Sequence, residues 1–369
     1  MKSFSEYIVD VSAIRHNILE FKKQSSKMVC AVVKADGYGI GAKYVVRAVD
    51  DLVGFYAVAC VAEAKKLRRY TNKNILILSW VPESALGFCA ENNISITVFN
   101  CQQVKALCKA KTKHKIKIHL AVNTGMNRIG FCDDKEFLQA VQKIKLCKNV
   151  CIEGIYTHFY NAENTTDTQK QNCIFIHFVG LLSGYVDIKK VICHAESSNA
   201  YFLSGFDYDM ARVGILLYGL LNKNKKQFKE VLSIKSKIIC ITKMKSGQSV
   251  GYGKNYIAKH NMAVATVPLG YADGIMRSLS KNGYVLIGGK YCKIVGNICM
   301  DMFMVDISNV GAKLFDRVVL IGCDNYGNCI SVNQVADWCG TIGYEVLTNI
   351  KKSRFNIKVK KVVYNDKKI

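Results

Sequence analysis

Apolar and polar residues follow two different patterns in the two parts of this chain. Over about the first 220 residues, short β-branched runs alternate with longer segments in which apolar residues recur at helical spacing. Eight runs have the composition of buried strands: residues 29–33, 56–60, 75–79, 94–99, 116–122, 151–157, 190–194 and 213–218. Residues 61–70 and 136–145 are good examples of the helices expected between them. This alternation predicts an α/β fold that begins with a TIM-like (β/α)8 barrel.

The pattern changes from about residue 230 onwards. Short strand-like runs are separated there by turns rich in Gly, Asn and Asp: residues 237–243, 262–268, 283–287, 291–295, 302–307 and 317–321. Only residues 332–339 have a helical pattern. We therefore expect a mostly antiparallel β domain at residues 229–369 after a barrel at residues 1–228, with the boundary in the Lys-rich segment 222–230.

Composition narrows the class of protein. The 369 residues are 50% hydrophobic and 22% charged, as expected for a globular protein of two domains. The net charge is +24, but the basic residues are spread along the whole chain, so we expect no nucleic-acid partner. The longest apolar stretch, residues 174–186, is too short to span a bilayer, and residues 1–17 lack the apolar core of a signal peptide. These features predict a cytoplasmic protein without a membrane partner.

Cysteine usage agrees with a reducing compartment. The chain has 16 cysteines, with no CxxC pair and no regular spacing. Several of them lie inside apolar runs, as Cys30, Cys60, Cys240 and Cys299 do. We therefore expect buried free thiols rather than disulfides, and no metal site.

Three polar residues follow predicted barrel strands, where the chemistry of such barrels is found. Lys34 ends the first strand in AVVKADGYGIG, and a desolvated lysine can form a Schiff base; the alternative is an exposed lysine before an ordinary turn. Arg128 in NTGMNRIG suits a carboxylate or a phosphate, or a surface salt bridge. His158 in YTHF is either catalytic or a structural histidine.

The last two barrel units and the β domain add further motifs. HAESSN, with Ser198, and RVGILLYG, with Gly214, offer hydroxyls and Gly-flanked amides that could bind a phosphate or only cap loops. The β domain contains VGYGKNY, PLGYADG, GNICMD and TIGYEV. Three of these four place a tyrosine next to a glycine, which is also typical of hairpin corners.

Eight of these motifs together resemble one family. KADGYG, NTGMNRIG, YTHF, RVGILLYG, VGYG, PLGYADG, GNICMD and TIGYEV occur in the order and approximate spacing of the alanine racemases, from about residue 5 to residue 355. Each motif is weak by itself, but eight in register are highly specific. The resemblance implies a fold type III enzyme that uses pyridoxal phosphate to interconvert L- and D-alanine, supplying D-alanine for peptidoglycan.

The resemblance also assigns roles to single residues. Lys34 matches the lysine that binds pyridoxal phosphate covalently and acts as one catalytic base. Tyr252 matches the opposite base, which comes from the partner subunit, so a homodimer with shared active sites is implied. Arg212 matches the arginine that faces the pyridine nitrogen, and His158 matches the histidine that links Arg212 to Tyr252.

The remaining matched positions bind the phosphate or the substrate. The phosphate positions are Tyr38, Ser198, Gly214, Ile215 and Tyr344. The substrate positions are Arg128, the Met300 amide, Tyr271 at the substrate entrance, and Asp301, which supports the same wall. Racemisation needs one base on each face of the α-carbon, and an amine and a phenol are suitable types. The phenol also needs a positive neighbour to work near neutral pH, which a hydrogen-bonded His158–Arg212 pair can supply.

The sequence departs from the family at several positions. Ala121 stands where a lysine, often carbamylated, usually pairs with the substrate-binding arginine, so we expect a chloride or another acid beside Arg128. Ile40 replaces a common histidine, and Ser197 replaces a frequent asparagine. Glu196 is an unusual acidic neighbour of a phosphate site, and we expect its side chain to point away.

Other functions remain as alternatives. A serine or broad-specificity racemase would share the fold, although Tyr344 and Tyr271 would crowd a large side chain and so favour alanine. A decarboxylase of diamino acids shares the architecture, but TIGYEV and GNICMD argue against it. A non-catalytic pyridoxal phosphate protein usually keeps only the barrel, whereas this chain retains the β domain and Tyr252.

Overall fold

A computed structural model describes residues 4–162, 164–198, 206–221 and 227–360. The chain forms two compact units. The barrel unit comprises Ile18–Gly37 and Val45–Leu217. The β unit comprises Met1–Asn17, Tyr38–Tyr44 and Tyr218–Ile369, so the first residues of the chain belong to the second unit. The division at residues 228 and 229 expected from the sequence stays a prediction.

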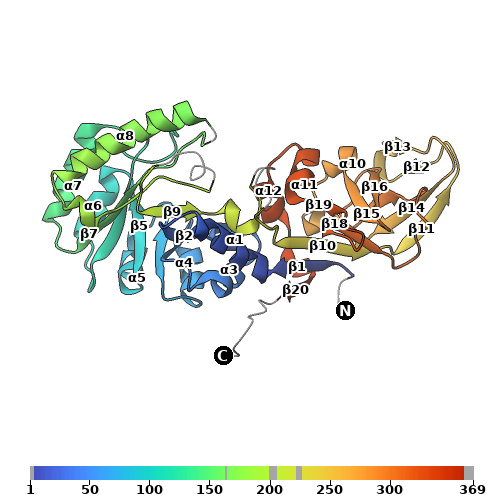
Figure 1. Cartoon of the computed structure of the whole chain (residues 1–369), viewed down its shortest axis with the longest axis horizontal. Coiled ribbons are helices and arrows are strands. Elements are labelled where there is room, and N and C mark those ends of the chain that lie inside the picture. Colours follow the sequence, from blue (N-terminus) through green and yellow to red (C-terminus); the bar gives the residue numbers. More distant parts are fainter. Residues whose placement is uncertain (1–3, 163, 199–205, 222–226, 361–369) are drawn as a thin grey trace. The chain divides into compact units, whose positions relative to one another are not determined.

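The barrel unit is built on eight parallel strands (Figure 1). They are β2 (Met28–Val32), β3 (Phe55–Val58), β4 (Asn74–Ile77), β5 (Ile94–Val98), β6 (Ile116–Ala121), β7 (Val150–Tyr156), β8 (Ile192–His194) and β9 (Met210–Val213). Their order is β8-β7-β6-β5-β4-β3-β2-β9. Two backbone hydrogen bonds of 3.0 Å, Asp209 to Cys193 and Arg212 to Glu196, join the last two strands. The predicted (β/α)8 barrel is therefore confirmed.

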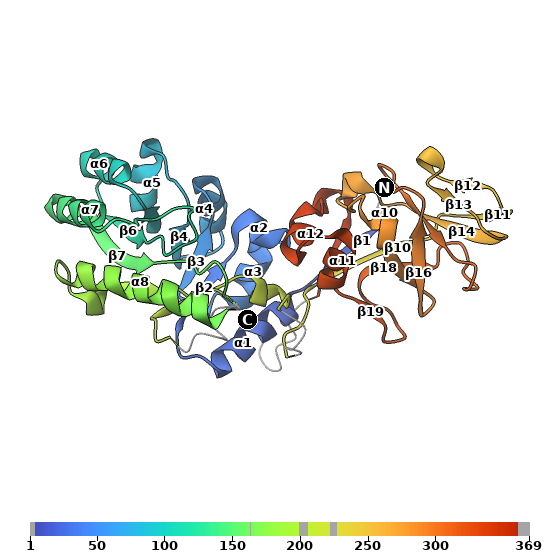
Figure 2. The ribbon, with the colours of Figure 1, turned by 90° about the horizontal axis from the view of Figure 1, so that it is seen from above.

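Helices lie along the outer side of these strands (Figure 2). They include α3 (Ala42–Val49), α4 (Val61–Arg68), α5 (Leu86–Glu91), α6 (Cys101–Lys109), α7 (Asp134–Leu146) and α8 (Thr165–Ser183), and α1 (Val11–Lys23) precedes the first barrel strand. Three of them begin at a residue whose side chain accepts a backbone N–H of the first turn: Asn100, Asp133 and Asn164. Such caps satisfy amides that have no partner inside the helix, which explains why the helices begin there.

The β unit contains the remaining strands. They are β1 (Glu6–Asp10), β10 (Leu232–Lys237), β11 (Cys240–Met244), β12 (Ser249–Val250), β13 (Tyr256–Ile257), β14 (Met262–Val267), β15 (Tyr284–Ile287), β16 (Lys290–Val295), β17 (Phe303–Asp306), β18 (Arg317–Cys323), β19 (Cys329–Ile330) and β20 (Asn356–Lys360). Ten form one sheet, ordered β11-β14-β17-β16-β15-β18-β10-β1-β20 with β19 beside β18, and β12 pairs with β13. Among the described strands of this unit, only β1 and β20 pair in parallel. The predicted mostly antiparallel domain is confirmed.

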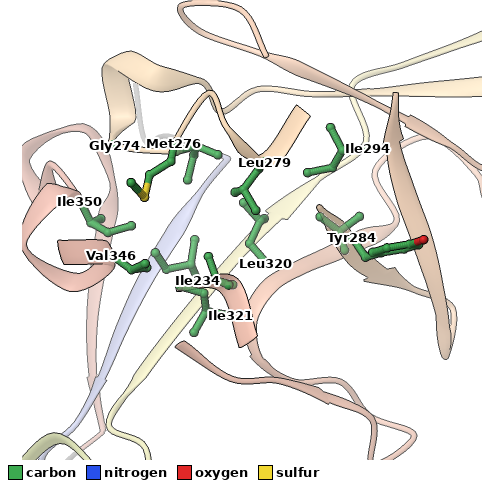
Figure 3. Close-up of a pocket in the computed structure, with 13 residues that line it drawn as sticks. Ile234, Gly274, Met276, Leu279, Tyr284, Ile294, Leu320, Ile321, Val346 and Ile350 are labelled. Atoms are coloured by element: carbon green, nitrogen blue, oxygen red, sulfur yellow. The ribbon is translucent and has the colours of Figure 1, made fainter. Parts of the chain in front are cut away.

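Three helices, α10 (Leu279–Asn282), α11 (Val332–Cys339) and α12 (Gly343–Asn349), belong to the β unit. Side chains from α10, α12 and the neighbouring strands surround a cavity of about 20 Å³ (Figure 3). Its lining is almost entirely apolar and includes Leu279, Leu320, Val346 and Ile350. A cavity of this size without polar partners does not retain water or bind a ligand, so we interpret it as a packing defect of the core.

Some elements differ from the sequence predictions. The eighth barrel strand was expected at residues 213–218, but β9 ends at Val213 and a 3-10 turn, η3 (Ile215–Tyr218), follows. Both segments are buried, and an apolar run alone does not distinguish a strand from a buried turn. The run expected at residues 237–243 is divided between β10 and β11.

The expectation that the cysteines are buried free thiols is wrong in part. Cys108 is bonded to Cys147 and Cys323 to Cys329. The second pair lies directly across the β18–β19 hairpin, and the first joins the ends of α6 and α7, so both pairings depend on spatial proximity that spacing does not reveal. Among the cysteines expected to be buried, Cys30 is buried, whereas Cys60 and Cys240 are exposed and Cys299 is half-buried.

Candidate active site

Lys34 begins a short left-handed turn directly after β2. The backbone φ angles of Ala35, Asp36, Gly37 and Tyr38 are +52°, +52°, +64° and +53°. Left-handed conformations cost roughly 1–2 kcal/mol for each residue with a Cβ. A run of three such non-glycine residues therefore needs contacts that hold it in place.

Glu63, in the first turn of α4, supplies one such contact. Its carboxylate accepts the backbone N–H of Ala35 at 2.7 Å and that of Ala59 at 2.8 Å. It thereby links the left-handed turn to the end of the neighbouring strand β3. Hydrogen bonds to an ionised acceptor are stronger than neutral ones, which suits a carboxylate to this role.

The amine of Lys34 is shifted towards its neutral form. Burial is the main cause of its lowered pKa, and the positive charge of Arg128 adds to it, while Glu63 opposes both. A lysine with a lowered pKa has more neutral amine near neutral pH, which makes it a better nucleophile and base.

Arg212, on β9, is buried and held from several sides. Its Nη1 donates to the Nδ1 of His194 at 2.7 Å and to the carbonyl of the same residue at 3.0 Å. Its Nη2 donates to the carbonyls of Thr157 at 2.6 Å and Ala195 at 3.0 Å, and lies 3.4 Å from the Nδ1 of His158. No described residue accepts the remaining Nε–H. The guanidinium is thus fixed with one donor unused.

His158 is neutral in this environment. Burial lowers its pKa to about 3, with further contributions from Arg212, Arg128 and Lys34. Because arginine has no acceptor, the Nδ1 of His158 must be the acceptor of the bond with Arg212. The proton of this neutral imidazole is therefore on Nε2.

The loops after β8 and β9 meet at Ser198. Its buried hydroxyl accepts the backbone N–H groups of Gly214 at 2.9 Å and Leu216 at 3.4 Å. Ile215 begins the turn η3 at this point. The carboxylate of the neighbouring Glu196 forms an ion pair with Lys27 at 2.8 Å. A hydroxyl and a turn of backbone amides therefore lie together.

Arg128 lies in an exposed loop after β6. Within the part of the chain that the structure describes, no hydrogen bond or ion pair holds its side chain. Asn123 orders this loop instead, since its Oδ1 accepts the backbone N–H groups of Gly125 at 3.1 Å and Asn127 at 2.9 Å. Ala121 is buried and offers no acid. The guanidinium remains available for an anionic group.

In the β unit, two of the predicted tyrosines, Tyr38 and Tyr344, lie near each other, and a third, Tyr252, is exposed in a turn. The ring of Tyr38 lies 5.7 Å from that of Tyr344 and 5.2 Å from that of Tyr218. Tyr252 begins the turn η4 (Tyr252–Lys254), and its side chain is 73% exposed. Its carbonyl accepts a hydrogen bond from Asn297 at 3.0 Å, which fixes the backbone while the phenol projects outwards.

Tyr271, Met300 and Asp301 lie together in the β unit. The backbone N–H of Tyr271 donates to the carbonyl of Cys299 at 3.1 Å, and that of Ala272 donates to Met300 at 2.9 Å. Arg354 joins the two loops by donating to Asp273 at 2.7 Å and to Asp301 at 2.6 Å. The Tyr271 and Met300 side chains are exposed. Hydrogen bonds therefore join the two loops, while the side chains of Tyr271 and Met300 stay accessible.

The sequence interpretation missed three polar residues of the barrel unit. Glu63 holds the turn after Lys34, His119 is buried next to His194, and Glu153 is bonded to His119. His119 and Glu153 could have been noticed, because each is a polar residue in a largely apolar strand. Glu63 gave no signal, since a glutamate in the first helical turn is ordinary.

The barrel unit thus brings together a half-buried amine, a fixed guanidinium and a neutral imidazole at the ends of its strands, beside a turn of backbone amides. This arrangement is typical of a (β/α)8-barrel enzyme whose polar groups gather at the ends of the strands. Comparison with known proteins identifies the group more closely. The family model "Alanine racemase, N-terminal domain" matches residues 9–222, and "Alanine racemase, C-terminal domain" matches residues 231–358. The chain belongs to the alanine racemase family.

Individual proteins of the family are similar over nearly the whole chain. The alanine racemase of Desulforamulus reducens is 36% identical over 355 residues, covering 92% of this chain and 94% of the relative. That of Lactococcus lactis subsp. cremoris is 37% identical over 352 residues, with the same coverage. The crystal structure of the Bacillus anthracis alanine racemase with bound L-Ala-P has a TM-score of 0.90 at 30% identity, covering 98% of this chain and 96% of that one. These findings confirm the resemblance inferred from the motifs.

The Bartonella henselae alanine racemase is a second structural neighbour. Its crystal structure contains covalently bound pyridoxal phosphate, and its TM-score is 0.87 at 28% identity, covering 96% of this chain and 99% of that one. Among the residues that the structure describes in our chain, no helix is both long and apolar enough to cross a membrane.

Proposed function

We propose that this chain racemises alanine with pyridoxal phosphate bound through Lys34, and that Tyr252 of the partner subunit is the second base. The observation that carries the proposal is the lowered pKa of the Lys34 amine in the same unit as a fixed guanidinium and a neutral imidazole. The names of the relatives support alanine as the substrate, and the bound cofactor of the Bartonella protein supports pyridoxal phosphate.

The residues present fit this cofactor. Lys34 supplies the amine for its aldehyde, and no described protein group accepts the Nε–H of Arg212, which is suited to the pyridine nitrogen. We propose that the phosphate is bound by the Ser198 hydroxyl, the amides of Gly214 and Ile215, and the hydroxyls of Tyr38 and Tyr344. When bound, the cofactor supplies the electron sink that makes removal of the α-proton feasible.

Arg212 determines the protonation of the group it faces. An arginine stays protonated and can only donate, so a ring nitrogen beside its Nε–H must accept and remain unprotonated. An unprotonated ring is a weaker electron sink. We propose that this restrains side reactions such as transamination and leaves proton transfer to the two bases.

Proton transfer on opposite faces requires two groups. We propose that the Lys34 amine serves one face and the phenol of Tyr252 of the partner subunit the other. The exposed phenol of Tyr252 in this chain is available to another subunit. Since the proton of His158 is on Nε2, this N–H can stabilise a phenolate, which allows a phenol to act as base near neutral pH.

The substrate carboxylate needs a cation, and Arg128 is available for it. We propose that Arg128 and the Met300 amide bind the carboxylate, and that Tyr271 and Asp301 form the wall that limits the side chain to one about the size of alanine. We also propose that the enzyme is a cytoplasmic homodimer that supplies D-alanine for peptidoglycan. The naming of its relatives as bacterial alanine racemases supports this role.

Lys34 provides a direct test. We expect the purified protein to show the visible absorption of a lysine-bound cofactor, and borohydride to fix the cofactor on Lys34, where peptide mass spectrometry locates it. Lys34→Ala should lack both the absorption and D-alanine formation. A labelled lysine other than Lys34, or a kcat/KM for serine or lysine above that for alanine, would contradict the proposal.

A further inference from the structure

The barrel interior contains a line of hydrogen-bonded polar side chains, of which the proposed mechanism uses only Arg212. It begins at Arg212, whose Nη1 lies 2.7 Å from the Nδ1 of His194. The Nε2 of His194 lies 2.8 Å from the Nδ1 of His119, and the Nε2 of His119 lies 3.1 Å from Glu153. Both histidines are fully buried. We call this series, Arg212–His194–His119–Glu153, the interior relay.

Backbone features make room for the interior relay. A Cβ on Gly154 would lie only 2.3 Å from the Nδ1 of His119, so this position must be glycine for the ring to occupy its place. The pairing of β6 with β7 also shifts by one residue between Ile118 and His119, which places Glu153 and Gly154 opposite the histidine. Bulges of this kind re-aim side chains and are typical of sites with a function.

The relay ends at the carboxylate of Glu153, which neighbouring side chains hold in place by hydrogen bonds. Glu153 also accepts hydrogen bonds from Ser95 and from Lys117, whose Nζ lies 3.0 Å away. Burial alone would raise the pKa of Glu153, but the hydrogen bonds from His119, Ser95 and Lys117 lower it below its ordinary value. The carboxylate is therefore ionised at any pH at which the enzyme works.

The chemistry of the donors fixes the direction of every bond. Arg212 can only donate, so the Nδ1 of His194 accepts and its proton is on Nε2. That N–H donates to the Nδ1 of His119, whose own proton is then on Nε2 and points at Glu153. A doubly protonated His119 would leave His194 with no proton on either nitrogen, a form that imidazole does not adopt near neutral pH. Both histidines are thus neutral and share one tautomer.

We infer that His119 and Glu153 are positioning residues for Arg212, and that the interior relay holds the guanidinium at the orientation in which its Nε–H remains free. This inference depends on the proposed function in one respect only, namely that Arg212 faces the pyridine nitrogen of the cofactor. If the carboxylate lost its charge, the acceptor that keeps the proton of His119 on Nε2 would be weaker. His194 could then carry its proton on Nδ1, where it would oppose the Nη1–H of Arg212.

The first experiment observes the tautomers directly in the holoenzyme. With 15N-labelled histidine, long-range proton–nitrogen correlation distinguishes the two tautomers of each ring, and His119→Gln and His194→Gln assign the signals among the seven histidines of the chain. We expect both rings to be neutral with the proton on Nε2. A proton on Nδ1 of either ring, or a doubly protonated ring, overturns the inference. Because no turnover is measured, this result is independent of whether alanine is the substrate.

The second experiment tests the consequence for Arg212. Glu153→Gln keeps the shape and an acceptor but removes the charge, and Gly154→Ala displaces the His119 ring. Glu230→Gln is the matched control, because Glu230 is another largely buried carboxylate with a backbone partner. We expect Glu153→Gln to weaken pyridoxal phosphate binding several-fold and to shift the cofactor absorption band, with KM for alanine within about twofold, and the control to do neither.

Two results would overturn the role of the relay. One is a Glu153→Gln enzyme whose cofactor affinity and absorption equal those of the control. The other is an Arg212–His194 distance that is unchanged in the crystal structure of Glu153→Gln. Should Gly154→Ala fail to fold, Glu153→Gln carries the test alone, since it adds no atoms to the interior.

Discussion

At the residue scale, the side chains with the clearest chemistry are those whose burial is compensated by directed hydrogen bonds. Arg212 makes its side-chain hydrogen bonds to carbonyls and imidazole nitrogens rather than to a carboxylate, and two histidines connect it to Glu153. A buried charge without partners would be strongly destabilising, so this network is a condition of the fold as well as of the site.

The sequence could predict which polar residues lie at the ends of strands, because a polar residue that directly follows an apolar run can be recognised from the pattern alone. Lys34 and His158 follow strands in this way, and the motifs assigned their roles. His119 could not be assigned, since its partners lie on β7 and β8 and depend on a register shift. Ser198 was placed correctly in the loop after the seventh strand, but its bonds to Gly214 and Leu216 required coordinates.

Glu230 provides a prediction for a single residue away from the site. Burial raises its pKa to about 7, although the N–H of Val332 opposes this shift. The folded protein therefore keeps Glu230 protonated at pH values where the unfolded chain is ionised, so the stability is lost as pH rises from about 4.5 through 7. We expect Glu230→Gln to raise the free energy of unfolding by roughly 2 kcal/mol at pH 8 and hardly at all at pH 4.5.

Chemical denaturation of the wild type and the variant at both pH values measures this difference. Glu345→Gln, an exposed glutamate of the same unit, is the control. Equal stabilisation at the two pH values would show that the effect is not one of ionisation.

At the element scale, the left-handed turn after β2 is the feature that most constrains Lys34. Three non-glycine residues in this conformation store strain, and Glu63 compensates by accepting the N–H groups of Ala35 and Ala59. The sequence predicted only a turn after the strand, because the handedness of a turn containing Ala and Asp is not encoded by residue type alone. Similarly, helix α11 (Val332–Cys339) matches its prediction, while the pairing of β1 with β20 has no sequence signal.

Removal of the Glu63 carboxylate should release this turn. We expect Glu63→Ala to weaken pyridoxal phosphate binding about tenfold, since the loss of bonds to a charged acceptor costs on the order of 1.5–3 kcal/mol. Ala35→Gly should restore part of that loss in the double variant, because glycine adopts the left-handed conformation without the Cβ penalty. Fluorescence titration of the apoprotein with pyridoxal phosphate measures the affinity.

Comparing the single and double variants with a control shows whether Glu63 acts by relieving strain in the turn or through its charge. Glu83→Ala removes an exposed glutamate of the same unit and should leave the affinity unchanged. A double variant that binds no better than Glu63→Ala would mean that Glu63 acts through its charge and not by holding the turn.

At the scale of the whole molecule, the fold class was predictable and the membership of the units was not. Eight strand–helix alternations predicted the barrel, and the change of pattern near residue 230 predicted the antiparallel domain. The strand β1 comes first in the chain, yet it pairs with β10 of the β unit. Five residues with alternating burial carry no information about a partner more than 200 residues away, so only the folded chain reveals it.

The high positive charge is also a property of the whole molecule. The net charge of +24 could indicate an anionic partner, but the proposed function needs only one small anionic ligand, a phosphate-bearing cofactor beside Lys34 and Arg212. The other basic residues are distributed along the chain, which does not require a polyanionic ligand.

The central claim is that two subunits complete one site, and mixed dimers test it most directly. Differently tagged chains allow purification of a dimer that pairs Lys34→Ala with Tyr252→Phe, and of another that pairs the wild type with the Lys34→Ala, Tyr252→Phe double variant. If each site uses Lys34 of one subunit and Tyr252 of the other, the first dimer has one intact site and should keep about half of the wild-type racemase activity, and the second should be inactive. An inactive first dimer beside a half-active second one would place both bases in a single chain and contradict the account.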